Sequence, residues 1–358
     1  MKQLKSKQIE IFCGTGGVGK TTLATSRALN LASKNKKILL VTVDPARRLK
    51  QILDIDDSKD LGIIKKIRTS KFTGRKSKNE HFFDALLLSP AITMTRVGEL
   101  NKTTTDLANP ILKVLTRPYG GLNEIMSIVE VQHQLSTGKY DTIILDTPPG
   151  KHFIDFLQAS EKIKHFFDKS FVEIFKYLGK SIEHKAQEAI SSKGIFSSLI
   201  SSGVKKLLSY LEKVTGSKFV DQFITAVIAI YKSKESFMDA LIFQEQLKDE
   251  SVSNWFLVTS IEQQKLDEAG ELQCLAVQFM HHDNFLAINK CLGSYLEKWE
   301  LEDSDSDLLK SLKENMLHKE KKLSTFSMKN FSKILEFPEI LEETPEKHVH
   351  ELSKHWVQ

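Results

Sequence analysis

The sequence predicts an α/β fold with a doubly wound, mostly parallel sheet and a helical insertion. Three observations lead to this fold class. Short apolar runs alternate with helical stretches, a glycine-rich turn joins the first strand to the first helix, and one long region shows helical patterns only. Strands that alternate with helices favour parallel pairing, because a parallel neighbour needs a crossover connection.

Six short apolar runs are predicted strands. They are Ile9–Cys13, Ile38–Val43, Thr142–Leu145, Trp255–Thr259, Phe285–Asn289 and Lys333–Phe337. The run that starts at Ile38 is continuously apolar, as expected for a strand that is covered on both faces. Between the first two runs, Lys20 to Ser33 has helical composition. These elements define a core that is built around one sheet.

The sequence changes character after residue 156, where strand-like runs disappear. We interpret 157–249 as a helical insertion, with 1–156 and 250–358 forming the two parts of one core. Within the insertion, Val204–Val214 and Val220–Tyr231 follow the i, i+3, i+4, i+7 spacing of amphipathic helices. Their apolar faces could form a groove for a client helix. Mutual packing is favoured, since any helical subdomain needs such stripes.

Three further segments carry simpler predictions. The charged segment Ser306–Ser332 predicts a helix, and the polar end Glu342–Gln358 predicts a partly mobile tail. The stretch Lys65–Lys78 is basic and contains no acidic residue. It predicts a solvated loop; contact with anionic lipid or nucleic acid is the weaker alternative, because regular aromatic interleaving is missing.

Composition limits the class of protein. The 358 residues carry a net charge of +5, with 41% hydrophobic and 27% charged residues, as in an ordinary globular protein and without a strong nucleic-acid signal. The three cysteines, Cys13, Cys274 and Cys291, form no C-x-x-C pair, so neither a disulfide framework nor a zinc site is expected. No apolar run suggests a signal peptide or a membrane span. We therefore expect a cytoplasmic protein.

The glycine-rich turn predicts a phosphate-binding loop. Its residues, Gly14, Thr15, Gly16, Gly17, Val18, Gly19, Lys20 and Thr21, match the pattern G-x-x-x-x-G-K-[ST] and are followed by Thr22. Glycines let backbone N–H groups surround phosphates, and the following helix presents its positive end to the anion. Lys20 would reach the β- and γ-phosphates of ATP, and the Thr21 hydroxyl would help to hold Mg²⁺.

A dinucleotide-binding turn is the rival interpretation. Gly14, Gly16 and Gly19 also satisfy G-x-G-x-x-G, and Asp44 then lies about where a ribose-binding acid would be. This rival leaves the Lys20-Thr21-Thr22 sequence unexplained, so the triphosphate interpretation is preferred.

Two aspartates follow predicted strands. Asp44 comes directly after the second strand, where it could orient the attacking water or contact Mg²⁺, or could cap a helix that starts at Pro45. Asp146 ends the strand Thr142–Leu145, as in the second signature of nucleotide-binding proteins, where this carboxylate supports Mg²⁺. That signature is weak alone and strong when combined with the phosphate loop.

Together these motifs resemble the ArsA-type P-loop ATPases. This family includes arsenite-efflux ATPases and the ATPase that targets tail-anchored membrane proteins, and it shares a deviant loop with MinD, ParA and the nitrogenase iron protein. The resemblance rests on GTGGVGKTT from Gly14, DPARRL from Asp44 and DTPPGKHFIDFL from Asp146, and on two later segments around Phe256 and Asn289.

The resemblance implies roles for individual residues. Asp44 would polarise the attacking water, and Asp146 would support Mg²⁺ and the γ-phosphate sensor. Asn289 would recognise the adenine edge, with residues near Pro338 lining the base. His152 would couple nucleotide state to the helices, although it could equally be an ordinary helix histidine. The family also implies a homodimer and, in some members, a hydrophobic client bound by the helical insertion.

The chain departs from the family pattern at two points. The family loop carries a second lysine where this chain has Thr15. Arg47 or Arg48 could supply the missing cation, because both are near Asp44 in sequence. The paired C-x-x-C motifs that hold zinc in the tail-anchored targeting ATPases are absent, and the separated cysteines argue against arsenite binding unless folding joins Cys274 and Cys291.

The predicted function is that of a Mg²⁺-dependent ATPase, which uses ATP to switch the conformation of a helical subdomain that binds a partner. Such an ATPase could act in transport or in membrane-protein targeting. A membrane-associated partner or a hydrophobic protein client would fit. The alternative is a nucleotide-gated positioning or scaffold protein that resembles MinD and ParA and has little intrinsic hydrolysis, because Thr15 replaces the second lysine.

Overall fold

The computed structural model describes residues 4–43, 52–54, 60–74, 80–103, 109–116, 123–166, 210, 212–302, 306–331, 333–342 and 344–356. These residues form two compact units. The first contains residues 1–88, 133–157 and 244–358, and the second contains 89–132 and 158–243. Residues 89–132, which the sequence predicts to be part of the core, thus fall in the second unit.

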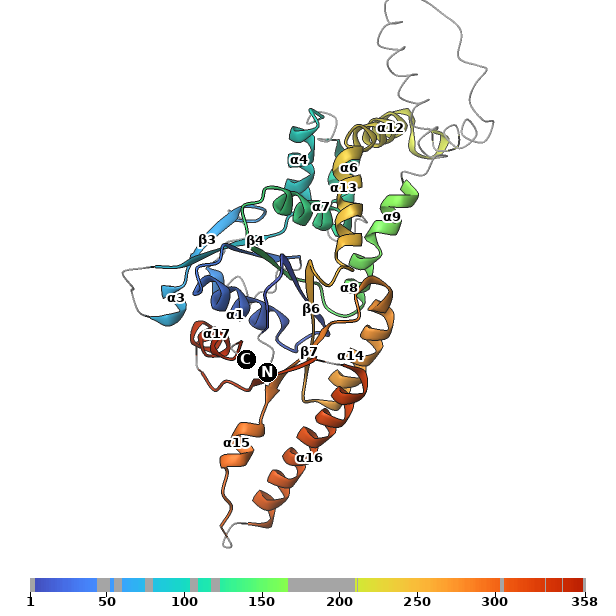
Figure 1. Ribbon diagram of the computed structural model, residues 1–358. Coiled ribbons are helices and arrows are strands. Elements are labelled where there is room, and N and C mark those ends of the chain that lie inside the picture. The colour runs from blue at the N-terminus through green and yellow to red at the C-terminus, as the bar shows by residue number, and fades with distance from the viewer. Residues whose placement is uncertain are drawn as a thin grey trace, which may run out of the picture. The chain divides into compact units, whose positions relative to one another are not determined.

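The first unit is built on an eight-stranded sheet (Figure 1). The strands are β1 (Ile9–Gly14), β2 (Ile38–Thr42), β3 (Ile64–Arg68), β4 (Phe82–Leu87), β5 (Thr142–Asp146), β6 (Ser253–Ser260), β7 (Phe285–Cys291) and β8 (Lys333–Pro338). Their order is β3-β4-β2-β5-β1-β6-β7-β8, and all pairs are parallel except β3 with β4. The predicted α/β fold is confirmed.

The chain winds outward in both directions from β1. β2 lies on one side of β1, beyond β5, and β6 and β7 lie on the other side. The register aligns Phe12 with both Asp146 and Phe256. β1 therefore marks the point where the strand order reverses, and in open α/β sheets ligands bind beyond the carboxyl ends of the strands at such a point.

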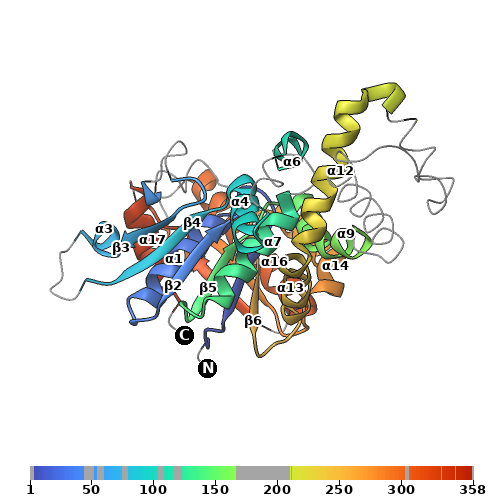
Figure 2. The same cartoon turned by 90° about the horizontal axis from the view of Figure 1, so that it is seen from above.

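Helix α1 (Lys20–Ala32) covers one face of the sheet, and α17 (Pro345–Lys354) packs beside it (Figure 2). The core on this face joins Phe12 and Phe256 to Trp356, which follows α17. On the other face, Phe153 of α8 (Lys151–Leu157) packs edge-on against Trp255. α14 (Gln263–Ala276) contacts both α8 and β6. Neighbouring β6 residues thus face opposite layers.

A buried ion pair joins β1 to α1. The Arg27 guanidinium donates from Nε and Nη2 to the two carboxylate oxygens of Glu10, at 2.7 and 2.8 Å, and both side chains are fully buried. Asn254 Nδ2 also donates to Glu10, at 3.3 Å, and the ring of Trp356 lies 5.1 Å from the guanidinium carbon. Every partner of this pair is therefore supplied by a different element.

The C-terminal segment is a docked helix, so the prediction of a mobile tail from Glu342 is wrong for the described residues. α17 starts with Thr344 as N-cap and Pro345 in the first turn. Val349, Leu352 and Trp356 are buried, and the Trp356 indole N–H donates to Ser26 Oγ of α1 at 2.8 Å. Three apolar side chains at helical spacing are enough to bury one face of a short helix.

The basic stretch that starts at Lys65 is also ordered in part, which corrects the prediction of a solvated loop. Residues Ile64–Arg68 form the antiparallel edge strand β3, and Ser70–Thr73 form the short helix α3. Ile67 is buried, while Lys66 and Arg68 are exposed. Charged side chains on an edge strand oppose pairing with other chains, which explains lysines in this strand.

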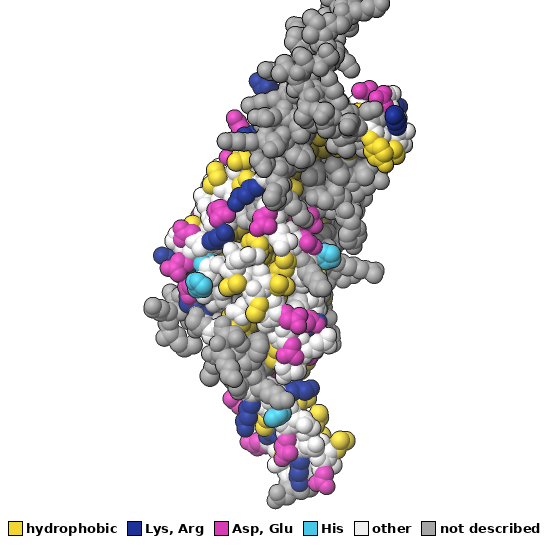
Figure 3. Space-filling view, turned by 90° about the vertical axis from the view of Figure 1, so that its right-hand side faces the viewer, with side chains coloured by type: hydrophobic (Ala, Val, Ile, Leu, Met, Phe, Trp, Pro, Cys, Tyr) yellow, Lys and Arg dark blue, Asp and Glu magenta, His cyan; other side chains and the backbone are white. Residues whose placement is uncertain are grey.

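Three more helices lie in the first unit: the short α15 (Gly293–Lys298) and the long α16 (Asp307–Asn330), with a 3₁₀ turn at Val277–Phe279. The predicted charged helix from Ser306 is confirmed by α16. In Figure 3 the lower tip carries hydrophobic, basic and acidic side chains together. No helix in the described part of the chain combines the length and the apolar character needed to cross a bilayer.

The second unit is helical. It contains α4 (Pro90–Leu100), α6 (Pro110–Leu115), α9 (Ala159–Phe166) and α12 (Ser217–Lys232), and most of α7 (Asn123–Ser136) and α13 (Lys234–Gln246). The predicted helix Val220–Tyr231 lies within α12, whereas most of Val204–Val214 lies outside the described residues. Polar contacts link these elements: Thr93 Oγ1 of α4 donates to Glu130 of α7 at 2.8 Å, and Asn109 Nδ2, just before α6, donates to the Gln222 carbonyl of α12 at 2.7 Å.

Candidate functional site

The phosphate loop follows the carboxyl end of β1. Gly14 has φ 149°, and a Cβ at this position would lie 2.2 Å from the Val258 carbonyl oxygen on β6. Only glycine fits so close to a neighbouring strand. At Gly16 and Gly17 a Cβ would meet no atom within 4 Å, so the loop has open space at these positions. This space is what a phosphate cradle requires.

Helix α1 begins at Lys20, directly after the loop. Its N-cap, Gly19, is left-handed with φ 91° and gives no side-chain cap to the helix. The first backbone N–H groups of a helix attract anions when no side chain caps them. The Lys20 side chain is buried, and its Nζ donates to the Thr15 carbonyl at 3.4 Å. Lysine and helix end therefore meet at the same loop.

Thr21 and Asp146 form a hydrogen-bonded pair. The Thr21 hydroxyl donates to Asp146 Oδ2 at 2.7 Å, and Asp146 is 2% exposed at the end of β5. A hydroxyl and a carboxylate are hard oxygen ligands of the kind that Mg²⁺ prefers. Thr21 and Asp146, both predicted to hold the metal, are thus brought together. The next residue of α1, Thr22, is buried.

The loop after Asp146 is tied to β1 and to the phosphate loop. The Thr147 hydroxyl and N–H both donate to the Phe12 carbonyl, at 2.8 and 3.1 Å, and the Gly150 N–H donates to the Gly14 carbonyl at 3.1 Å. The sequence does not predict these contacts, because each motif covers a single stretch, whereas these bonds join separate stretches through the Thr147 hydroxyl and through backbone groups.

Asn289 reaches the phosphate loop from β7. Its Nδ2 donates to the Val18 carbonyl at 2.9 Å, and a Cβ on Gly19 would lie 2.3 Å from the same nitrogen. Its Oδ1 is buried and has no hydrogen-bond partner among the described residues. A buried amide oxygen without a partner is costly, so it is suited to accept a hydrogen bond from a ligand. The exocyclic amine of adenine is such a donor.

Pro338 ends β8 in register with Cys291 of β7, two residues after Asn289. It lines a cavity of about 430 Å³ together with Tyr295, Ile340 and other residues of α15 and α17. Pro338 thus lies at the end of the strand that neighbours the strand of Asn289.

Thr15 occupies the position of the second loop lysine. It is 4% exposed, and its hydroxyl has no hydrogen-bond partner in the described part of the chain. Its carbonyl oxygen accepts a hydrogen bond from the Lys20 ammonium. The loop is therefore well formed around a threonine, without a second lysine.

Asp44, Arg47 and Arg48 lie outside the described residues, so their predicted roles stay predictions. The chain before them is placed beside the second signature: Thr42 pairs with Asp146 in register, and the Val43 N–H donates to the Asp146 carbonyl at 3.1 Å. His152 is described and is exposed on α8, 3.7 Å from Asp155 of the same helix. This arrangement fits an ordinary helix histidine.

The three cysteines differ in exposure. Cys13 and Cys291 are buried, and burial raises the pKa of each thiol to about 12, whereas Cys274 is exposed on α14. The described residues contain no group of three or more histidine, cysteine, aspartate or glutamate side chains that could hold a metal ion.

Comparison with known proteins identifies the family. The family model described as anion-transporting ATPase (ArsA) matches residues 7–314, a range that includes the glycine-rich loop, Asp146 and Asn289. The chain belongs to the anion-transporting ATPase family.

Individual members of the anion-transporting ATPase family are similar over shorter stretches. ATPase GET3 of Malassezia globosa is 26% identical over 228 residues, which covers 63% of this chain and 60% of the relative. ATPase get3 of Pyrenophora tritici-repentis is 32% identical over 149 residues, covering 40% and 41%. An ATPase ASNA1 homolog of Plasmodium berghei is 26% identical over 151 residues, covering 42% and 36%. The aligned part is less than two thirds of each relative.

Proposed function

We propose that this chain binds ATP with Mg²⁺, hydrolyses it, and uses the nucleotide state to switch a helical unit that binds a partner. The observation that carries the proposal is the 2.7 Å hydrogen bond between Thr21 and Asp146, which joins the phosphate loop to the second signature. Family membership supports nucleotide use, because the family is one of ATPases.

The residues of the site fit a magnesium nucleotide. Lys20 and the N–H groups at the start of α1 would hold the phosphate oxygens, and the space at Gly16 and Gly17 leaves room for them. Thr21 and Asp146 would hold Mg²⁺, which neutralises charge on the phosphates when bound. Asp44 would orient the attacking water and accept a proton from it. Asn289 would accept a hydrogen bond from adenine, with Pro338 beside the base.

The partner proposal rests on the helical unit. Apolar side chains one turn apart are exposed on consecutive helices: Phe219 and Phe223 on α12, and Met238 and Ile242 on α13, with Ile242 at 57% exposure. Exposed apolar pairs on neighbouring helices favour contact with another apolar surface. We therefore propose a hydrophobic protein segment or a membrane-associated protein as partner. A homodimer in a cytoplasmic setting is proposed by analogy with the family.

Nucleotide turnover tests the first part of the proposal. Phosphate release from ATP should require Mg²⁺. Lys20→Ala should abolish ATP binding, because the cation that faces the phosphates is lost, and Asp44→Asn should keep binding and lose turnover. Full turnover in the Asp44→Asn variant would remove the role assigned to Asp44. Arg47→Ala and Arg48→Ala report whether either arginine replaces the second lysine, and unchanged rates in both would exclude this.

The same variants separate the ATPase from a positioning protein. A wild-type chain that binds ATP with high affinity, shows almost no turnover and sediments with liposomes or DNA only in the presence of ATP would support the alternative function. Retention of apolar helical peptides by the ATP-bound Asp44→Asn variant, weakened by Ile242→Asp, would support the client-binding unit.

A further inference from the structure

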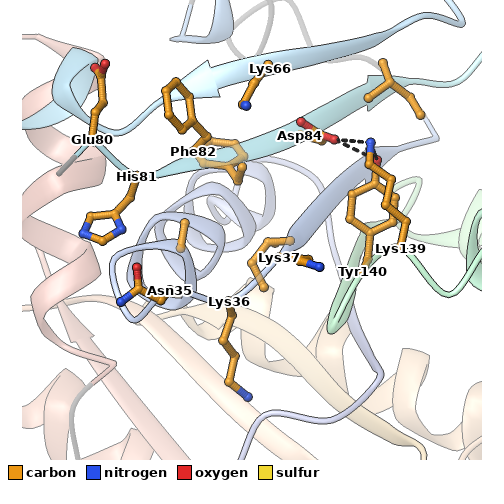
Figure 4. Close-up of a pocket in the computed structure, with 14 residues that line it drawn as sticks. Asn35, Lys36, Lys37, Lys66, Glu80, His81, Phe82, Asp84, Lys139 and Tyr140 are labelled. Carbon is orange, nitrogen blue, oxygen red and sulfur yellow. Dashed lines mark hydrogen bonds and ion pairs between the residues drawn. The ribbon is translucent and has the colours of Figure 1, made fainter.

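A second cavity lies at the opposite end of α1 from the phosphate loop (Figure 4). It has a volume of about 630 Å³ and is bordered by the end of α1, the starts of β2 and β4, and the edge strand β3. α1 spans 13 residues, so the cavity is about 20 Å from Lys20. Strands β2 and β4 begin here, whereas the nucleotide site lies where parallel strands end. The two sites are therefore separate.

The wall of this cavity is positively charged. It contains Lys36, Lys37, Lys66 and Lys139, against the carboxylates Glu80 and Asp84. Both carboxylates already have cationic neighbours. Glu80 lies 3.9 Å from Arg68, and Asp84 accepts a hydrogen bond from the Lys139 ammonium at 2.8 Å. A net positive charge therefore remains at the cavity.

Among the described residues only Lys139 of these four lysines has an anionic partner, and Lys36 donates to the Ser6 hydroxyl. The ammonium groups of Lys37 and Lys66 form no hydrogen bond and no ion pair with the described residues. They come from different elements, since Lys37 precedes β2 and Lys66 lies in β3. Both line the same cavity, so an anion placed there could be approached from two sides.

Two aromatic side chains, Phe82 and Tyr140, also line the cavity. Lys66 Nζ lies 4.3 Å from the ring centre of Phe82, and Lys139 Nζ lies 4.8 Å from that of Tyr140. The Tyr140 hydroxyl donates to Asp84 at 2.8 Å, the same carboxylate oxygen that binds Lys139, so this corner is held by three side chains. Rings beside lysines provide both stacking surface and charge.

We propose that this cavity binds a small organic anion that carries a planar ring. The ring would pack against Phe82 and Tyr140, and the anionic group would be held by Lys37 and Lys66. The volume is within the range of small-molecule sites, which combine apolar walls with a few charged groups. A membrane surface fits less well, because a concave cavity offers no flat face to lipid headgroups.

Phenyl phosphate is a suitable probe, because it joins a planar ring to a phosphate. Isothermal titration of the full chain should show saturable binding of phenyl phosphate, with weaker binding of inorganic phosphate and of phenol alone. Because phosphate compounds could also enter the phosphate loop, the titrations are repeated with Lys20→Ala. The proposal requires that phenyl phosphate binding survives this change, whether or not the chain hydrolyses ATP.

Matched variants locate the site. The double variant Lys37→Gln/Lys66→Gln should weaken phenyl phosphate binding by roughly tenfold or more, since two charge-assisted contacts are lost. The control Lys71→Gln/Lys218→Gln removes the same charge from exposed positions outside the cavity and should change binding by no more than about twofold, because distant charges are screened. Phe82→Leu should reduce the advantage of phenyl phosphate over inorganic phosphate.

Three results would overturn the proposal. The first is equal affinity in the two lysine double variants, and the second is equal affinity for phenyl phosphate and inorganic phosphate. The third is an absence of saturable binding, including the case in which the chain sediments with anionic vesicles instead. Circular dichroism of each variant checks that a lost signal does not reflect unfolding.

Discussion

The hydroxyl of Thr21 donates to the carboxylate of Asp146 across 2.7 Å, although 125 residues separate them in sequence. The first residue lies at the start of α1 and the second at the end of β5, two elements that pack against each other. The pair places two oxygen ligands next to the lysine of the phosphate loop. This pair is the feature on which we base the proposal that the loop binds a magnesium nucleotide and not a dinucleotide.

Removal of the Thr21 hydroxyl should therefore raise the Mg²⁺ requirement. In Thr21→Val the shape is retained but one oxygen ligand is lost, so the Mg²⁺ concentration for half-maximal ATP binding should rise by about tenfold or more. Titration of Mg²⁺ with a fluorescent ATP analogue measures this. Thr25→Val, one turn further along α1, is the control, since the Thr25 hydroxyl bonds to the Thr21 carbonyl and not to Asp146. An unchanged Mg²⁺ requirement in Thr21→Val would contradict the site.

Asn289 should determine selectivity for adenine. Asn289→Ala removes the buried Oδ1 that has no partner among the described residues, so ATP affinity should fall by about tenfold while GTP affinity changes little. Direct binding titrations with both nucleotides give the ratio. Asn284→Ala, which changes an asparagine just before β7, is the control. A parallel loss of both affinities would show that Asn289 acts only by holding the Val18 carbonyl.

The ion pair between Glu10 and Arg27 should be critical for stability. Glu10→Gln leaves Arg27 buried without a full counter-charge and should destabilise the chain by about 3–5 kcal/mol. The double variant Glu10→Leu/Arg27→Met should recover most of this loss, because neither charge then stays buried. The midpoint of urea unfolding, followed by tryptophan fluorescence, measures both effects. If the double variant were less stable than Glu10→Gln, the loss would come from packing and not from the unpaired charge.

The cysteines should differ in reactivity with pH. The thiolate is the reactive form, and a thiol pKa of about 12 keeps Cys13 and Cys291 protonated through the neutral and mildly alkaline range. Iodoacetamide at pH 8.5 should thus modify exposed Cys274 in the native chain, with the other two reacting only after denaturation or as the pH rises toward 12. Peptide mass spectrometry identifies the sites. Early modification of Cys13 would show that β1 is accessible.

The sequence was sufficient for elements whose pattern is determined locally. Six strands were predicted because each is a short apolar run; most are buried on both faces, as in β1 and β6, whereas β8 is buried only in part. β3 and β4 were missed. β3 is an edge strand with two lysines and an arginine among its five residues, so its composition is that of a loop. α17 was missed because the segment is mostly polar. Only three apolar side chains, Val349, Leu352 and the following Trp356, pack it against the core.

The candidate site was predictable in residue types and not in contacts. The pattern from Gly14 to Thr22 determines the loop, because few other sequences place glycines and a lysine at this spacing. The contact of Asn289 with Val18 joins residues 271 positions apart, and the bond from Gly150 to Gly14 is between backbone groups. Such contacts depend on strand order and register, which no local pattern encodes. Asp44 remains a prediction from sequence.

The docking of Trp356 on Ser26 has a consequence for synthesis on the ribosome. These residues are 330 positions apart. At a synthesis rate of roughly 5–20 residues per second, α1 is therefore made about 15–65 s before Trp356. During this interval the apolar side of α1 and the guanidinium of Arg27 lack their contact with Trp356, which has not yet been synthesised. The nascent chain should therefore be a substrate for chaperones until translation reaches α17, and the nucleotide site should mature only after that point.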